Sequence, residues 1–148
     1  MAEGAEGTET PDSAEEVLTE SAELVWRNVH PDFYDEGNQS ITSQAFRATA
    51  KDQKKPSGAR EAKVTASKHF DEFTTLLKFK SAGVWAVTVA EIDAEGIRAV
   101  YDEHAHTAPT PCTTGHTYFD YTELSSSKMK QVAGKLRDKA EARGRKHP

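Results

Sequence analysis

The stretch GVWAVTVAEI at residues 83–92 is the feature of this sequence that most constrains the fold. Alternate residues of a strand point to opposite faces of a sheet, and here the residues on both faces are largely apolar. A continuous apolar run of this length is typical of a strand inside a sheet. We therefore expect a β-sheet in which this segment is a central strand.

Two further segments have clear boundaries. Residues 24–29 (LVWRNV) read as a strand, which should end at His30, because the following proline restricts that residue and has no amide to donate. Thr65 has the position of a helix N-cap, and apolar residues recur after it at helical spacing to about residue 79. The chain thus combines strand and helix patterns.

Weaker patterns complete the expected fold. We predict a short helix from a capping box at 13–16, strands at 40–49, 96–104 and 116–124, a charged loop at 50–63, and a helix from Ser125 or Ser126 to residue 143. The strand at 96–104 would pair with the one at 83–92 as a hairpin. The fold class that follows is α+β, with a four- or five-stranded mixed or antiparallel sheet and two main helices packed on one face.

Composition favours one domain in a cytoplasmic protein. The 148 residues are 36% hydrophobic, enough for a single core. Residues 1–12 predict a disordered acidic tail, 13–144 a single α+β domain and 145–148 a basic tail. No apolar run approaches the roughly 18 residues of a membrane span. The first residues lack the regions of a secretory signal, and the single cysteine fits a reducing compartment, so we expect a cytoplasmic protein without membrane contact.

The two ends of the chain carry opposite charges. Residues 1–23 contain eight acidic and no basic residues, whereas residues 125–148 contain eight basic and two acidic ones. Ends of opposite sign attract each other or present separate surfaces to partners, and they are also common as solvated termini. The acidic end and the sequence pI of about 5.7 argue against general binding of nucleic acid. We expect a protein partner or a homodimer.

The sequence lacks the common signatures of cofactor and metal sites. It contains no GxxxxGK[ST], GxGxxG, GxSxG or HExxH motif, so we expect no cofactor. His104, His106 and Cys112 lie within nine residues and include ligand types that suit zinc or nickel. On a proline-rich loop, flexible polar residues are the commoner outcome, and we therefore assign no metal ligands.

Two histidines are the main candidates for catalysis. His30 and His116 each lie at the edge of a predicted strand, and a pair of histidines can supply the base and the acid of one phosphoryl transfer. Arg27 and Arg47 could clamp the phosphate. The further ligand-binding candidates are polar and aromatic neighbours: Ser43, Gln44, Tyr34 and Tyr118. The structural alternative is that His30 caps a turn and His116 packs against tyrosines.

Three stretches, VWRNVHPDF, SQAFRAT and SAGVWAVTV, together resemble a group of small uncharacterised bacterial proteins over residues 24–143. This resemblance implies no activity. The layout is also similar to that of ADP-ribosyltransferase-like domains, which carry an Arg or His on the first strand, then a polar-aromatic segment and a late acidic residue. Arg27 or His30, Ser43 and Glu123 occur in that order. The glycine-rich geometry and the tyrosines of such families are missing at the expected places.

Two functions from different classes remain open at this stage. The first is a small bacterial accessory or interaction protein, such as an adaptor or immunity factor, and it rests on the missing catalytic motifs and the oppositely charged ends. The second is a small enzyme that acts on a nucleotide or another phosphate-containing ligand. In that enzyme His30 and His116 would be the acid–base pair, with Arg27 and Arg47 as the anion clamp.

Overall fold

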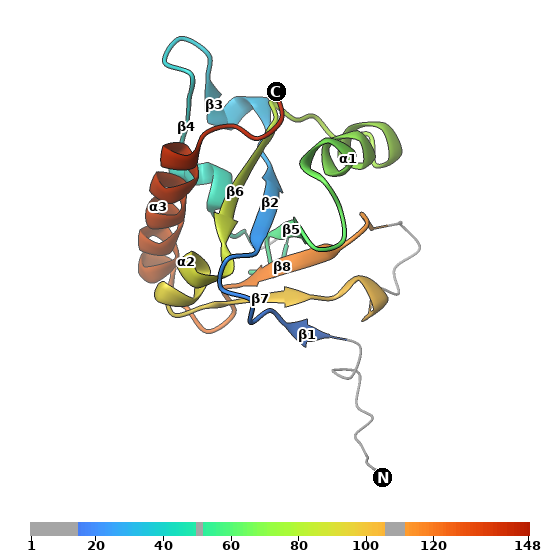
Figure 1. The fold of residues 1–148 in the computed structure, drawn as a ribbon. Helices are drawn as coiled ribbons and strands as arrows, with labels where there is room; N and C mark the ends of the chain where they lie inside the picture. Colours follow the sequence, from blue (N-terminus) through green and yellow to red (C-terminus); the bar gives the residue numbers. More distant parts are fainter. Residues whose placement is uncertain (1–14, 50–51, 106–111) are drawn as a thin grey trace.

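The computed structural model describes residues 15–49, 52–105 and 112–148. These residues form an α+β fold around a six-stranded sheet in the order β1-β7-β8-β5-β2-β6, in which all pairings are antiparallel (Figure 1). Its strands are β1 (Glu16–Val17), β2 (Leu24–Asn28), β5 (Ser57–Arg60), β6 (Val84–Thr88), β7 (Arg98–Tyr101) and β8 (His116–Asp120). A separate two-stranded sheet pairs β3 (Tyr34–Asp35) with β4 (Ser40–Ile41).

The described residues contain more strands than the four or five that the sequence predicted. Strand β5 lies inside the segment predicted as a charged loop, and its sequence SGAR has no apolar alternation. Gly58 is required there, because a Cβ at this position would lie 2.6 Å from the carbonyl oxygen of Trp26. Strand β1 occupies Glu16–Val17 where a short helix was predicted, and Ser13 of the predicted capping box lies outside the described residues.

The position of the apolar segment at 83–92 was wrong in two respects. Strand β6 ends at Thr88, which forms a capping box with Glu91 and starts helix α2 (Val89–Ala94). Strand β6 is also an edge strand, not a central one, and β7 pairs with β1 and β8 instead of forming a hairpin with it. Part of the exposed edge of β6 is covered, because the Val84 amide donates to the carbonyl of His147 (2.9 Å) and Arg143 donates to the carbonyl of Ala86 (3.0 Å).

The predicted strand at 40–49 was also too long. Only Ser40–Ile41 are paired as β4, and a 3₁₀ turn, η3 (Ser43–Phe46), follows. Ala45 and Phe46 of this turn are buried, which explains the apolar residues that had suggested a strand. Residues 116–124 are paired only as far as Asp120.

The predicted helix starts at Thr65 and Ser125 are confirmed. The Thr65 hydroxyl accepts from the amide of Lys68 (3.1 Å) at the start of α1 (Ala66–Asp71). Ser125 accepts from the amide of Lys128 (3.2 Å) at the start of α3 (Ser126–Arg143). Helix α1 continues into a π-helical turn, η4 (Glu72–Leu76). In the described part of the chain no helix is both long and apolar enough to cross a bilayer.

Helices α1 and α3 cover opposite faces of the sheet, which corrects the expectation that the two main helices pack on one face (Figure 1). Leu136 and other α3 residues join Val25 and Val87 in the larger core. Phe70 of α1 packs against the smaller cluster, which contains Trp26. Because consecutive strand residues point to opposite faces, Val25 and Trp26 mark the two sides. We call them the α3 face and the α1 face.

Candidate functional site

Polar side chains gather on the α1 face, where they surround a cavity of about 180 Å³. We call it the inner cavity. Its lining combines basic, hydroxyl, amide and apolar groups: Arg27, Asn28, Ser57, His69, Phe73, Leu77, Phe79, Cys112, Thr113 and His116. These residues come from β2, β5, α1, the π-helical turn and the start of β8, so the cavity lies where α1 and its continuation meet the sheet.

Three side chains on neighbouring strands form a chain of hydrogen bonds at this cavity. The Nδ1 of His116 lies 2.5 Å from Oδ1 of Asp102, and its Nε2 lies 3.3 Å from the hydroxyl oxygen of Ser57. Asp102 follows β7, while His116 starts β8 and Ser57 starts β5. We call this set the Ser57–His116–Asp102 triad. Its connectivity is that of an activated hydroxyl: a carboxylate orients the imidazole, and the imidazole can take the proton of the hydroxyl.

Arg27 is one of the residues that line the inner cavity, although strand alternation puts its side chain on the same face of the sheet as Val25. Its Nε donates to the carbonyl of Ala45 (2.9 Å) and its Nη1 to the carbonyl of Ser57 (2.5 Å). Burial lowers the pKa of the Arg27 guanidinium, and the neighbouring Tyr121 and Asp52 partly offset this. No carboxylate among the described residues pairs with it within ion-pair distance. Because a guanidinium stays protonated and has five donors, this group is able to bind an anion.

Three buried polar atoms on the walls of this cavity lack a hydrogen-bond partner. They are Nδ1 of His69, Nδ2 of Asn28 and Oγ1 of Thr113. Each belongs to a residue that is less than a tenth exposed. Buried polar atoms in folded proteins are almost always satisfied, so a group of unsatisfied ones around one cavity indicates a ligand or water.

His69 is neutral at physiological pH. Burial above all, together with the neighbouring His116 and Arg27, lowers the pKa of its imidazole to about 4. A neutral imidazole donates through one nitrogen and accepts through the other. His69 therefore adds hydrogen-bonding capacity to the cavity without adding charge.

A second cavity of about 390 Å³ adjoins the first, and we call it the outer cavity. It shares Arg27, Asn28, Phe73 and Phe79 with the inner one. The residues that line the outer cavity alone are His30, Phe33, Ala45, Lys78 and Lys80.

The structure places the two predicted catalytic histidines in different cavities. His116 lines the inner cavity, while His30 lines the outer one and caps the 3₁₀ turn η2 (Pro31–Phe33), where its Nδ1 accepts from the amide of Asp32 (3.0 Å). Arg27, the first of the two predicted clamp residues, lines both cavities. The second predicted clamp, Arg47, lines neither of them, and its Nε is buried without a partner.

The other predicted ligand-binding residues line neither of these two cavities. Ser43 and Gln44 are in η3, and the exposed Glu123 of the ADP-ribosyltransferase-like order follows β8. The hydroxyl of Tyr118 donates to Glu15 (3.3 Å), and its ring lies under the Lys55 ammonium. Burial, together with the charges of Glu15 and Asp120, raises the pKa of Tyr118.

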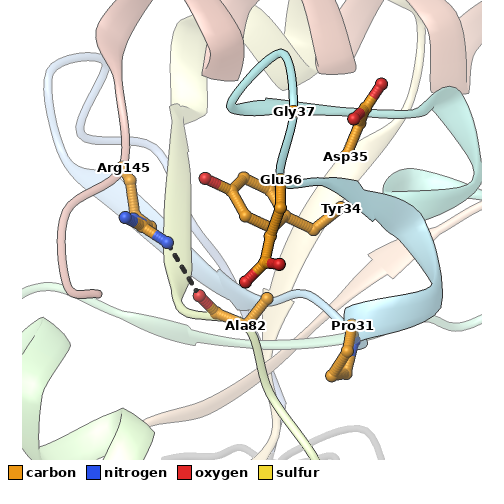
Figure 2. Close-up of a pocket in the computed structure, with 7 residues that line it drawn as sticks. All are labelled: Pro31, Tyr34, Asp35, Glu36, Gly37, Ala82 and Arg145. Carbon is orange, nitrogen blue, oxygen red and sulfur yellow. Dashed lines mark hydrogen bonds between the residues drawn. The ribbon is translucent and has the colours of Figure 1, made fainter.

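Tyr34 lines a hollow of about 660 Å³, larger than the inner and outer cavities, between the β3–β4 hairpin and the C-terminal segment (Figure 2). Arg145 crosses this hollow with its guanidinium 5.2 Å from the Tyr34 ring centre, and donates to the carbonyl of Ala82 (3.2 Å). Asp35 on its rim accepts from Asn38. These charged groups already have partners, and the hollow contains no base and hydroxyl in contact. Its size therefore does not make it the better site.

No group of three or more His, Cys, Asp or Glu side chains in the described ranges has the arrangement of a metal site. His104 and Cys112 are described, whereas His106 of the metal hypothesis lies outside those ranges. Burial raises the pKa of the Cys112 thiol, which lines the inner cavity.

Comparisons with protein-family models, curated proteins and solved structures find no match to this chain. The site is therefore interpreted from its own geometry.

Sequence reasoning missed most of the cavity wall. Asn28, Ser57, His69 and Thr113 of this wall were not singled out, although Arg27 and His116 were. Asp102, which bonds His116 but does not line the cavity, was not singled out either. Ser57 and Asp102 stand in segments expected to be a loop and a strand end, and His69 is one polar residue within a helix. A local signal existed only for Asp102, because a carboxylate shortly before a second strand can face a histidine across a hairpin.

Proposed function

We propose that this protein is a small enzyme that cleaves or transfers phosphate esters at the inner cavity. The observation that supports this most directly is that the Ser57–His116–Asp102 triad opens on the same cavity as Arg27. A triad alone would suit many acyl or phosphoryl transfers. A buried guanidinium without a carboxylate partner favours a substrate that brings its own negative charge, and its planar donors match phosphate oxygens.

The proposed step is an in-line displacement. The Ser57 oxygen forms a bond to phosphorus as the bond from phosphorus to the leaving oxygen breaks. His116 takes the proton of the Ser57 hydroxyl at Nε2, while the leaving oxygen, on the opposite side of phosphorus, takes a proton from water. Water then attacks phosphorus opposite Ser57 and loses its proton to solvent, and His116 returns its proton to the Ser57 oxygen as phosphate is released. Asp102 holds the imidazole in the required tautomer, and Arg27 stabilises the charge on the phosphoryl oxygens.

The test is turnover of chromogenic phosphate monoesters and diesters by the full chain and three variants. His116→Ala and Ser57→Ala should each lower kcat/KM by about 10²-fold or more, and Asp102→Asn should do so with little change in KM. The matched control is His104→Ala, because His104 is exposed and lines neither cavity. Turnover that survives His116→Ala, in a variant with unchanged circular dichroism, would contradict the proposal.

A second candidate function is binding of a protein partner or a second copy of the chain. The observation that favours it is the exposure of two large apolar side chains near the outer cavity, Leu76 (52%) and Phe79 (55%). Sedimentation velocity over a wide concentration range tests the homodimer. A dimer that dissociates in the Leu76→Ala variant would support it, and a monomer at all concentrations would exclude self-association through this surface.

A further inference from the structure

The outer cavity is more aromatic and more basic than the inner one, with which it shares two of its phenyl rings. Three phenyl rings line it, and two of them, Phe73 and Phe79, lie 5.2 Å apart between centres. On another part of the wall the His30 ring lies 5.9 Å from that of Phe33. Aromatic side chains of this kind provide stacking surfaces for planar ring systems.

The same cavity is basic. Lys78 and Lys80 line it together with Arg27, and no acidic residue does. Lys78 has a left-handed backbone with φ of 63°, which is uncommon for a residue with a side chain. Strained backbone positions often occur at binding sites. The outer cavity thus suits a ligand that combines a flat ring with negative charge.

The segment that carries Phe73 and Phe79 is held in place over the inner cavity. The amide of Phe79 donates to the carbonyl of Phe73 (3.1 Å). Glu72, one residue earlier, accepts from both the amide (2.7 Å) and the hydroxyl (2.8 Å) of Thr114. The segment includes the π-helical turn, a feature found frequently at functional sites. The aromatic wall is therefore anchored to the loop that contains Thr113.

The two cavities share some of their lining residues and differ in the others. Arg27, Asn28, Phe73 and Phe79 line both. One ligand can therefore reach from the triad to the aromatic rings. Cavities of about 180 and 390 Å³ together match the range of about 300–1,000 Å³ typical of small-molecule sites.

We infer that the substrate is a mononucleotide, with its phosphate at Arg27 in the inner cavity and its base among Phe33, Phe73 and Phe79 in the outer one. This inference rests on the proposed function, because it takes the phosphate position from it. It adds the substrate class and the residues that select it. Stacking is sequence-tolerant, so purine and pyrimidine nucleotides both bind, with the purine more tightly because its ring is larger.

The experiment is isothermal titration of the full chain with inorganic phosphate, ribose 5-phosphate, adenosine, AMP and UMP. AMP should bind about tenfold or more tightly than ribose 5-phosphate, because one stacked base contributes on that order. The Phe79→Ala variant should bind AMP no better than ribose 5-phosphate and should keep its affinity for ribose 5-phosphate. Phe79 is more than half exposed, so this substitution is not expected to unfold the chain.

Two variants complete the test. Val17→Ala is the control, because Val17 is an exposed apolar residue of β1 and lines neither cavity. Its affinity for AMP should be unchanged. Arg27→Lys should weaken the binding of every phosphate-containing ligand and leave the binding of adenosine unchanged, because a lysine keeps the charge and loses the planar donors.

The possible outcomes distinguish a failure of the mononucleotide inference from a failure of the proposed phosphate-ester function. If phosphate and ribose 5-phosphate bind through Arg27 but AMP binds no better, the base site is overturned and the phosphate-ester function survives. If AMP binds tightly and Phe79→Ala changes nothing, the outer cavity is not the base site. If no phosphate-containing ligand binds, both the inference and the proposed function fall.

Discussion

The two faces of the sheet use residues from the same strands for different purposes. On the α3 face, Val25, Trp85 and Phe119 join α3 in a large apolar core. On the α1 face, the apolar cluster is small and adjoins the inner cavity. Of the five buried side-chain atoms without a partner in the described residues, three line that cavity. The comparison indicates that one face stabilises the fold and the other tolerates unsatisfied polar groups for binding.

The largest expected contrast comes from removing one phenyl ring from each face. Phe119→Ala on the α3 face should lower the free energy of unfolding by about 4 kcal/mol, because its ring is almost fully buried and leaves a cavity. Phe73→Ala on the α1 face should lower it by only about 1 kcal/mol, because that ring is half-buried beside existing space. Urea denaturation with a constant m-value measures both. Equal losses would remove the distinction between the faces.

The second prediction concerns the acid sensitivity of the α1 face. His69 has a pKa of about 4 in the folded chain, against 6.5 for an ordinary histidine, so the unfolded chain binds more protons between these values. The contribution of His69 to the free energy of unfolding should therefore be fully present above about pH 6.5. It should be about 3 kcal/mol smaller at about pH 4. His69→Phe keeps a ring and removes the titration. The difference in unfolding free energy between the wild-type chain and this variant should change with pH across that window, and a constant difference would contradict the prediction.

The third prediction concerns a buried hydroxyl group on the α3 face that has a hydrogen-bond partner. The buried Tyr121 hydroxyl donates to the carbonyl of Phe46 at 2.6 Å. Tyr121→Phe should lower the free energy of unfolding by about 1–2 kcal/mol, because the carbonyl loses its partner in a buried position. Thermal and urea unfolding should agree on the loss. No change would show that water replaces the hydroxyl.

The smallest expected effect has the opposite sign. Thr113→Val replaces a buried hydroxyl without a partner by a methyl group of similar size, so it should raise the free energy of unfolding by up to about 1 kcal/mol. The same variant should bind phosphate esters more weakly, because the cavity loses a polar group. A gain in stability with unchanged binding would assign Thr113 to the fold alone.

Part of this architecture could be predicted locally. The caps at Thr65 and Ser125, and strand segments within 24–29, 83–92, 96–104 and 116–124, follow from patterns a few residues long. The strand at Ser57–Arg60 could not, because SGAR has no pattern of its own. Its pairing depends on β2 and β8 accepting a residue without a Cβ at Gly58.

The candidate site divides in the same way. Arg27 and His116 could be selected because basic residues at predicted strand ends are candidates from sequence alone. His69 could not, because its importance comes from burial beside His116 and Arg27 and not from its neighbours in sequence. The expected pairing of His116 with His30 differs from the arrangement observed, in which Asp102 and Ser57 are its hydrogen-bonding neighbours.

The sequence by itself determined the α+β class, the helix starts and the strong apolar strand, because these depend on backbone preferences and side-chain spacing within one segment. Only the tertiary structure decided that the apolar segment is an edge strand, that the helices take opposite faces, and that residues from 27 to 116 meet at one cavity. The reason is physical. The alternation of apolar and polar residues along a strand indicates which residues are buried. Which residues they contact on other strands is set by the free energy of the whole chain.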